Sequence, residues 1–314
     1  MDEDDDLRAL EDEVAQGPGD GWAWGRLGQA YGEASQHGLA LEAFERATRL
    51  LPDSSESWWG LALAHHNRGE DEAALEAARR SAALAPQDAQ ALALFALQLR
   101  LAGRDHEAIP VADDAVRLRP TWAFPRALLG LARHAVGDHG GAVGPLEASL
   151  RLRADQPRVW GALGVSLAEL ERFVEAANAL ETAVFHHPDD GTAWGRLGQA
   201  YTETGRHREA MPAYERAVEL GFTPPGVWAN MGRSAAEVRD LRALGRAYQH
   251  LRGPYPADAE VLKGKLVELH RERRLRRRRR TRARGGGEDG RGAWALGPER
   301  RKAATREGGP ATAG

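Results

Sequence analysis

The stretch WGRLGQAY, residues 24–31, occurs a second time without change at residues 194–201. The two copies lie 170 residues apart, which is five times 34. Five tryptophans of the chain fall on this spacing, each a whole multiple of 34 residues from the others: Trp24, Trp58, Trp160, Trp194 and Trp228. A fixed period of this length indicates that the chain is built by stacking one supersecondary unit.

Small residues and prolines recur with the same period. One column of the repeat reads Gly28, Ala62, Ala96, Gly130, Gly164, Gly198 and Gly232. A second column reads Ala40, Ala74, Ala108, Ala142, Ala176 and Ala210, followed by Leu244. Most copies end in proline, at Pro52, Pro86, Pro120, Pro188 and Pro256. Proline cannot continue a helix, and the small side chains predict that two helices approach each other closely.

Each copy carries the apolar pattern of two helices. In the first copy, the first helix has an apolar face spaced i, i+3, i+4 and i+7, made of Trp24, Leu27, Gly28 and Tyr31. A second helix begins near Leu39 and carries Ala40, Phe44 and Ala47. One helix pair cannot bury both of its faces, so neighbouring pairs must stack. We expect the five tryptophans to belong to the resulting core.

The order Trp, Leu-Gly, Tyr, Ala, Phe, Ala and Pro within 34 residues resembles the tetratricopeptide repeat family. The first copy has the full set in Trp24, Leu27, Gly28, Tyr31, Ala40, Phe44, Ala47 and Pro52. Copies in register tile residues 21–258 without insertion. The resemblance implies an all-α fold, a right-handed superhelical solenoid of about seven tandem helix-turn-helix repeats with capping helices. His65 and Arg133 replace the aromatic residue of the Tyr31 column, which predicts local looseness in the second and fourth copies.

The segments outside the repeats differ strongly in charge. Residues 1–20 are acidic, and we expect residues 7–17 within them to form a capping helix. A second capping helix is expected over 259–284, where it runs into an arginine-rich stretch. Residues 285–314 lack periodicity and are expected to be disordered. The last 44 residues carry 15 basic and 5 acidic side chains, although the whole chain has a net charge of −3.

Composition narrows the class of protein. The 314 residues include no cysteine, which excludes disulfides, thiolate zinc sites and cysteine nucleophiles. The acidic start MDEDDD is unlike a signal peptide, and no apolar run is long enough to span a bilayer. The sequence therefore predicts a soluble, cytoplasmic protein.

Catalytic and metal-binding motifs are missing from the sequence. The glycine-rich stretches at 17–21 and 137–144 are not followed by Lys-Ser or Lys-Thr, and both fall in repeat turns, so they do not predict a phosphate-binding loop. The histidine pairs at 65–66 and 186–187 are adjacent and point to different sides of a helix, which does not suit a metal site. We expect no metal, no cofactor and no enzymatic activity.

The residues that follow the first-helix packing face by about 100° are candidates for a binding surface. In the resembled family such positions line the inner, concave side. The column of Gln29 is polar at both ends of the repeat array and apolar in the middle, and neighbouring apolar residues extend the middle part. The predicted groove consists of Trp59, Leu63, Leu94, Leu97, Leu128, Leu131 and Val165.

Such a groove predicts a non-enzymatic scaffold or adaptor that receives a peptide or helix of a partner protein, whose identity the sequence leaves open. The alternative is that a composition rich in alanine and leucine scatters apolar residues over the surface without function.

Two polar sites are further candidates. Corresponding positions of the last two repeats carry Arg196, Gln199, Asn230 and Arg233, which predict a carboxylate-binding cluster because arginine offers a two-pronged donor fork. The arginine run 273–284 includes Arg276, Arg277, Arg278, Arg279 and Arg280, which predict phosphate binding. No aromatic residue interrupts the run, so nucleic-acid or anionic-surface binding there would be weak and non-specific. Alternatively, the run solvates the last helix or contacts the acidic residues 2–6 of the same or another chain.

Overall fold

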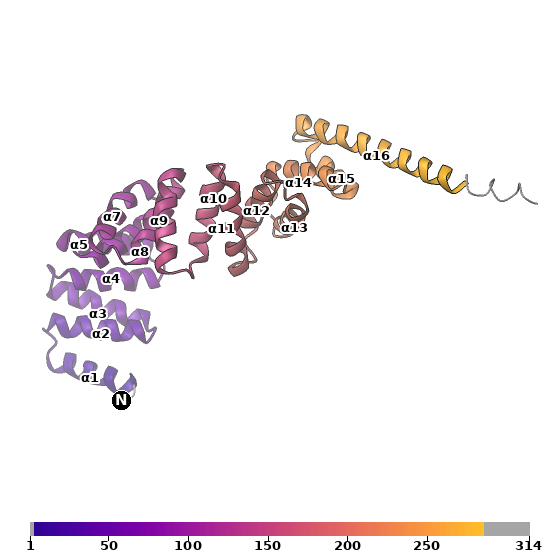
Figure 1. The fold of residues 1–314 in the computed structure, drawn as a ribbon. Helices are drawn as coiled ribbons and strands as arrows, with labels where there is room; N and C mark the ends of the chain where they lie inside the picture. The colour runs from indigo at the N-terminus through magenta and orange to yellow at the C-terminus, as the bar shows by residue number, and fades with distance from the viewer. Residues whose placement is uncertain (1–2, 286–314) are drawn as a thin grey trace, which may run out of the picture.

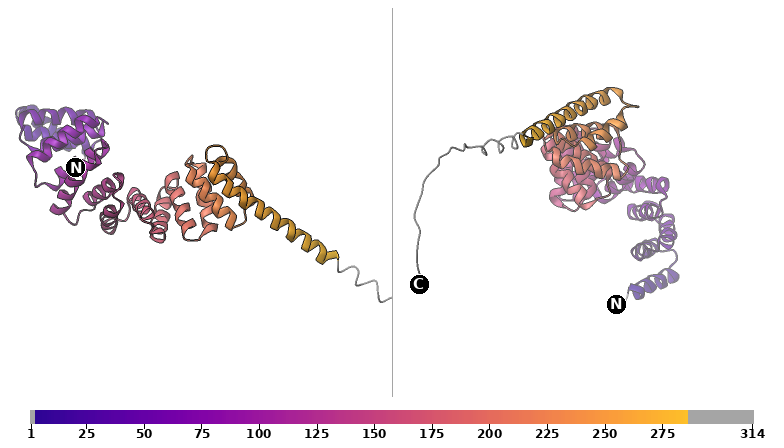
Figure 2. Two further views of the ribbon diagram at one scale, coloured as in Figure 1. Left: turned by 90° about the horizontal axis from the view of Figure 1, so that it is seen from above. Right: turned by 90° about the vertical axis from the view of Figure 1, so that its right-hand side faces the viewer.

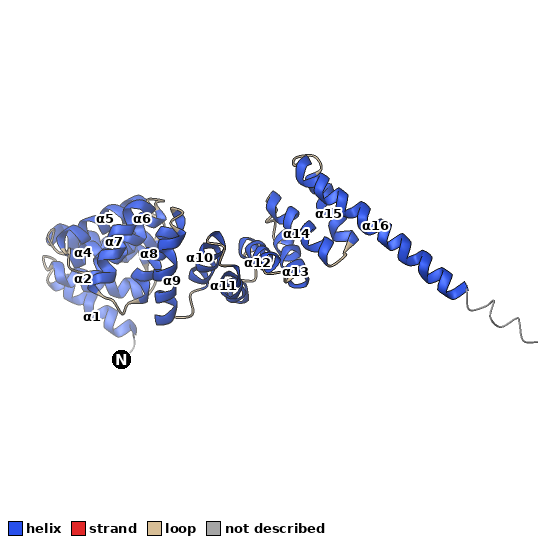
Figure 3. Cartoon of the chain, turned by 45° about the horizontal axis from the view of Figure 1, so that its top comes forward, coloured by secondary structure: helices blue, strands red, loops and turns tan. Residues whose placement is uncertain are grey.

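The computed structural model describes residues 3–285, and all regular elements in that range are helices (Figures 1 and 3). They are α1 (Glu3–Gln16), α2 (Gly21–Glu33), α3 (His37–Leu50), α4 (Ser55–Asn67), α5 (Asp71–Leu84), α6 (Ala89–Leu101), α7 (Asp105–Leu118), α8 (Ala123–Ala135), α9 (His139–Leu152), α10 (Pro157–Glu169), α11 (Phe173–His186), α12 (Gly191–Glu203), α13 (His207–Glu219), α14 (Pro225–Glu237), α15 (Leu241–Leu251) and α16 (Pro256–Gly285). The expected disorder of 285–314 lies outside the described residues, apart from Gly285. The all-α superhelical repeat predicted from the sequence is confirmed.

The helices from α2 to α15 form pairs that follow one another along an elongated, curved stack (Figures 1 and 2). The first helices of successive pairs contact one another, as α2 contacts α4 and α6 contacts α8. The second helices do not approach one another within the described range. The first helices therefore form the closely spaced inner layer, and the second helices form the more widely spaced outer layer. The surface of the inner layer is the concave side of the stack.

Glycine in the small column brings the two helices of a pair together. A Cβ atom placed on Gly130 would lie 2.6 Å from the Leu146 side chain, and one on Gly164 would lie 2.5 Å from Leu180 Cγ. Both leucines are fully buried. The close approach predicted from this column is present in the structure, and it lets each second helix place a leucine directly against the first.

The tryptophan column lies at the edge of the core for the most part, which corrects the expectation from the sequence. Only Trp228 is buried, and its ring stacks on His250 with a centroid separation of 3.8 Å. The other four rings are half-buried, and each indole Nε1 donates to the carbonyl oxygen six residues earlier, over 2.8 to 3.0 Å. These acceptors are the carbonyls of Pro18, Pro52, Ala154 and Pro188. The column therefore fastens the loop between repeats while its ring covers the core edge.

The two copies without an aromatic residue in the Tyr31 column hold their helices by polar contacts. His65 Nδ1 lies 2.6 Å from Glu70 Oε2, and Arg133 Nη1 donates 2.9 Å to the carbonyl oxygen of Gly141. Each contact joins a first helix to the start of the second helix. The looseness predicted for the second and fourth copies thus has a polar replacement for the missing ring.

The terminal helices close the two ends of the stack. α1 packs on α2 through Val14, which is buried. α16 packs on α14 and α15 through Ala259 and Leu262, and its later turns extend beyond the body of the stack (Figure 1). Because α1 and α16 lie at opposite ends, the described parts of the acidic and arginine-rich segments of one chain do not meet.

Two buried tyrosines make the stability of the chain depend on alkaline pH. The hydroxyl of Tyr31 donates 2.8 Å to Glu11, and that of Tyr201 donates 2.8 Å to Glu181. Burial, followed by these hydrogen bonds, raises the pKa of each tyrosine to about 12. The ordinary tyrosine pKa is 10.0, so the folded chain binds more protons than the unfolded chain between the two values.

We therefore expect stability to be complete below about pH 10 and to fall as the pH rises toward about 12. The urea midpoint, followed by circular dichroism at several pH values, should fall over this window, and it should fall less steeply in Tyr201→Phe. An equally steep fall in the variant would contradict this assignment.

Candidate partner-binding groove

An apolar stripe crosses four consecutive helices of the inner layer. Leu63, Leu97, Leu131 and Val165 occupy one equivalent position on α4, α6, α8 and α10, and all four side chains are half-buried. The same position holds the exposed Gln29 on α2 and the exposed Arg233 on α14. The stripe therefore has polar ends, as the sequence predicts.

Two residues of the predicted groove are not available to a partner. Leu94 is 5% exposed and Leu128 is 2% exposed, and both belong to the core. Their column corresponds to Gly60, where an added Cβ would collide with the ring of Phe44 from the preceding pair. This column therefore points between successive pairs, one residue around the helix from the exposed face. The groove is accordingly reduced to Trp59 and the four residues of the apolar stripe.

A pocket at the amino-terminal end of the stripe has an aromatic floor. It has a volume of about 270 Å³ and lies between α2 and α4, with Trp59 and Leu63 beside the nearly buried Phe44. Gln29 and Glu33 form its polar rim, where the Gln29 amide nitrogen donates 2.9 Å to Glu33 Oε1. A volume of this size accommodates one large apolar side chain.

A second cavity, of about 360 Å³, shares Gln29, Phe44 and Trp59 with this pocket. Trp22 lines it and is 53% exposed. Sequence reasoning missed Trp22 and the pocket floor Phe44. The signal for Trp22 was present, because it precedes Gln29 by seven residues and therefore shares its helix face. Phe44 gave no such signal, because it belongs to the family pattern of core residues.

The all-round apolar character of the middle helices is explained largely by the chain itself. α6 contacts α4, α5, α7 and α8, so neighbouring helices cover most of its surface. Two large apolar side chains in this region remain exposed, Leu101 at 49% and Phe124 at 38%. Leu101 follows Leu97 by one turn and Phe124 precedes Leu131 by two turns, so both extend the same inner face.

The predicted carboxylate-binding residues form two separate groups, and each already holds a carboxylate of the chain. Arg196 Nη1 lies 2.8 Å from Glu169 Oε1 and 3.2 Å from Gln199 Oε1. Arg233 Nη2 lies 2.8 Å from Glu203 Oε1 and 2.5 Å from Asn230 Oδ1. In each group the glutamate comes from the preceding inner helix. A ligand carboxylate would have to displace these glutamates, so the geometry favours a structural role.

A histidine pair lies near the carboxyl ends of α8 and α10. His134 Nδ1 is 2.9 Å from the hydroxyl of the buried Ser166, and the His139 ring lies 5.5 Å from that of His134. Burial lowers the pKa of His134, and the positive charges of His139 and Arg100 lower it further. His134 is therefore held neutral at physiological pH and adds no charge to the groove.

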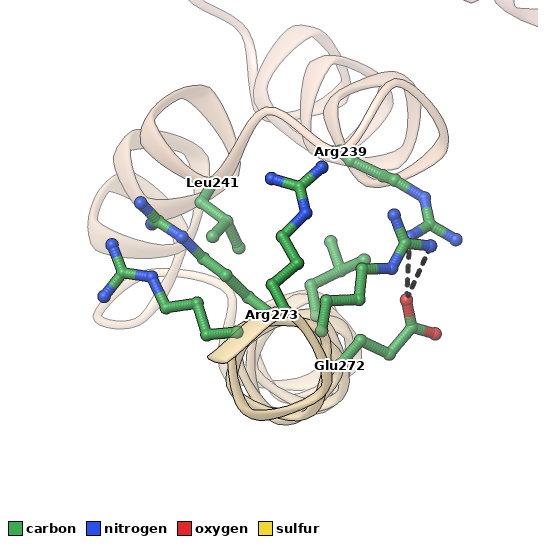
Figure 4. A pocket seen from close by; sticks show the side chains of 8 residues that line it. Arg239, Leu241, Glu272 and Arg273 are labelled. Carbon is green, nitrogen blue, oxygen red and sulfur yellow. Dashed lines mark hydrogen bonds and ion pairs between the residues drawn. The ribbon is translucent and has the colours of Figure 1, made fainter. Parts of the chain in front are cut away.

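The arginine run divides into residues that face the body of the protein and residues that do not. Arg276, Arg277 and Arg280 line a cavity between α16 and the turn from α14 to α15, whereas Arg278 and Arg279 do not. Figure 4 shows this cavity from close by. Among the described residues there is no group of three or more acidic or histidine side chains that could bind a metal ion. Over the same range, no helix has the length and apolar character that a bilayer crossing requires.

Comparisons with known proteins agree with this architecture. The tetratricopeptide repeat family model matches residues 26–89 and 162–224. The solved structure of YrrB, a TPR protein with an unusual peptide-binding site, aligns with a TM-score of 0.52 and 16% identity over 60% of this chain and 96% of YrrB. A chain of the APC/C hetero-tetramer Cut9–Hcn1 aligns with a TM-score of 0.52 and 18% identity. That alignment covers 84% of this chain and 52% of the other. No curated protein matches the sequence.

Proposed function

The chain is a tetratricopeptide repeat protein, and from this premise we propose that it is a non-enzymatic scaffold that binds a partner peptide or helix on its concave surface. The observation that carries the proposal is the apolar stripe of Leu63, Leu97, Leu131 and Val165, which runs across four adjacent inner helices and begins at the pocket beside Trp59. A partner is needed to remove this surface from water.

The spacing of the stripe suits a regular peptide. Packed helices lie about 8 to 10 Å apart, so the stripe presents one apolar residue at roughly that interval. An extended segment advances about 10 Å in three residues, and a helix advances about 10 Å in seven. A partner with apolar side chains at either spacing would contact each inner helix in turn. The pocket between α2 and α4 would receive one larger anchor, such as leucine or phenylalanine.

A similar peptide-binding role is known for a protein of the same fold, since YrrB is a TPR protein with a peptide-binding site. The low identity of 16% carries only the fold to this chain, so the proposed groove rests on its own exposed apolar residues. The lack of a catalytic or metal-ligating constellation among the described residues is in keeping with a binding role.

The test uses peptides selected from a random library on the immobilised full-length protein. We expect Leu97→Glu with Leu131→Glu to weaken binding of the selected peptides at least about tenfold, because two buried contacts become charged. Leu118→Glu with Leu152→Glu is the matched control, since these leucines are exposed on the outer layer of successive pairs. Fluorescence anisotropy with labelled peptides gives each Kd, and circular dichroism confirms that the variants are folded.

Equal affinity of the parent and the inner-layer variant would contradict the proposed groove, as would a loss confined to the outer-layer control. If the inner-layer variant fails to fold, Trp59→Ala replaces it. That change removes a wall of the pocket, and it should lower affinity most for peptides that carry a large apolar anchor.

A further inference from the structure

The packing face of α16 changes from apolar to cationic along its length. Leu262, Leu266 and Leu269 lie along the face that packs on the body of the protein. The same spacing of three and four residues continues through Arg273, Arg276 and Arg280. The arginines of this stripe therefore face the same side as the leucines, toward the end of the repeat array.

These arginines and the body of the protein enclose a cavity of about 430 Å³. Arg273 projects from α16 toward the turn between α14 and α15, where Arg239 and Leu241 lie (Figure 4). The complete lining is Arg239, Leu241, Leu269, Glu272, Arg273, Arg276, Arg277 and Arg280. Guanidinium groups thus approach the cavity from two different elements of the fold.

The positive charge of the cavity is compensated only in small part. Glu272 is the one acidic residue among the lining residues, and it pairs with Arg239 over 2.8 Å and with Arg276 over 3.9 Å. The nearby Asp240 caps α15 by accepting from the amides of Arg242 and Ala243, and it does not line the cavity. Five arginines and one glutamate leave an excess of four positive charges in a small volume, where like charges repel.

Arg239 occupies a backbone position where glycine would be easier to accommodate. Its φ angle is 62°, in the left-handed region. The equivalent turn holds glycine in four other copies: Gly69, Gly103, Gly137 and Gly205. A non-glycine residue in this region is disfavoured. The chain nevertheless has an arginine here, and its guanidinium lies on the cavity opposite those of α16.

We propose that this cavity binds an oligophosphate, a compact anion with several linked phosphate groups. Phosphate oxygens match the two-pronged donor geometry of guanidinium, and each phosphate brings at least one negative charge. Linked phosphates concentrate several charges in a small volume, as an excess of four positive charges requires. An acidic peptide presents its carboxylates about 3.3 Å or more apart along an extended chain, and would place fewer of them in the cavity. The site is independent of the concave groove.

The test is calorimetric titration of the full-length protein with inorganic triphosphate, at about 50 mM salt so that screening is limited. Arg273→Gln with Arg276→Gln removes two lining charges, and Arg278→Gln with Arg279→Gln removes two charges from the same helix that do not line the cavity. Glutamine keeps a high helix propensity in both variants. We expect the lining variant to lose affinity at least about tenfold and the control variant to lose less than about threefold.

The control separates a built site from general attraction to positive charge. Equal losses in the two variants would overturn the proposal, and so would the absence of measurable triphosphate binding to the parent. A single-stranded oligonucleotide provides a second arm. If it binds more tightly than triphosphate, and both variants weaken it equally, the arginine run is a non-specific nucleic-acid surface and the oligophosphate site is wrong.

Discussion

Replacing Gly164 by leucine is expected to destabilise the protein by about 3 kcal/mol, because the new side chain has no room. A Cβ atom at this position would lie 2.5 Å from Leu180 Cγ and 3.2 Å from the backbone nitrogen of Leu180. Leu180 is fully buried in the core cluster that runs through the second half of the solenoid. Relief would require α10 and α11 to separate, and each of them also packs on the neighbouring pair.

Gly161 provides the matched control on the same helix. It lies one turn before Gly164, and a Cβ atom there meets no other atom within 4 Å. Gly161→Leu should therefore leave stability unchanged or raise it by up to about 1 kcal/mol, since leucine favours helix more than glycine does. Urea unfolding followed by far-ultraviolet circular dichroism measures both variants. Similar midpoints for the two leucine variants would contradict the close approach of α10 and α11.

The second large effect is expected from Trp228→Ala, which should cost about 3 to 5 kcal/mol. Trp228 is 7% exposed, and its ring lies parallel to that of His250 at 3.8 Å. Its removal opens a cavity where α14 meets α15, next to the helix that closes the array. Nearby Gly232 leaves no side chain that could fill the space.

Trp160→Ala is expected to cost less, about 2 kcal/mol, although the two tryptophans hold the same position in the repeat. Trp160 is half-buried, and its main polar contact is the 2.9 Å hydrogen bond from Nε1 to the carbonyl oxygen of Ala154. Such a bond contributes about 1 kcal/mol, and the remainder comes from partial burial of the ring. Equal losses for the two variants in urea unfolding would show that the half-buried rings belong to the core after all.

The repeat architecture could be predicted from the sequence because every copy states it independently. The small column of Gly130 and Gly164 is needed wherever a second helix packs against a first, so the same requirement is written seven times. Errors in single copies, such as His65 or Arg133, do not change the register. Periodicity therefore determines the helices, their pairing and their stacking.

The candidate site was less predictable because one residue around a helix separates an exposed position from a buried one. Leu94 and Leu128 lie next to exposed columns in the sequence, yet both point between successive pairs and are buried. Arg196 and Arg233 have suitable chemistry for a ligand, but the glutamates that hold them come from other helices. Contacts between repeats decide these cases, and a pattern within one repeat does not contain them.

The arginine run shows the same limit in a different form. Its charge is evident from the sequence, but only the packing of α16 separates Arg276, Arg277 and Arg280, which line a cavity, from Arg278 and Arg279, which do not. The partner in that cavity across the gap, Arg239, lies more than thirty residues earlier in the chain. No local pattern links these residues.

The most direct test of the concave groove is a methyl nuclear magnetic resonance titration of leucine- and valine-labelled protein with a selected peptide. We predict shift changes at Leu63, Leu97, Leu131 and Val165, on the inner face. Leu118 and Leu152, which are exposed on the outer layer, should not shift. Changes confined to these outer leucines, or to Leu275 on α16, would contradict the account, because the partner would then bind a different surface.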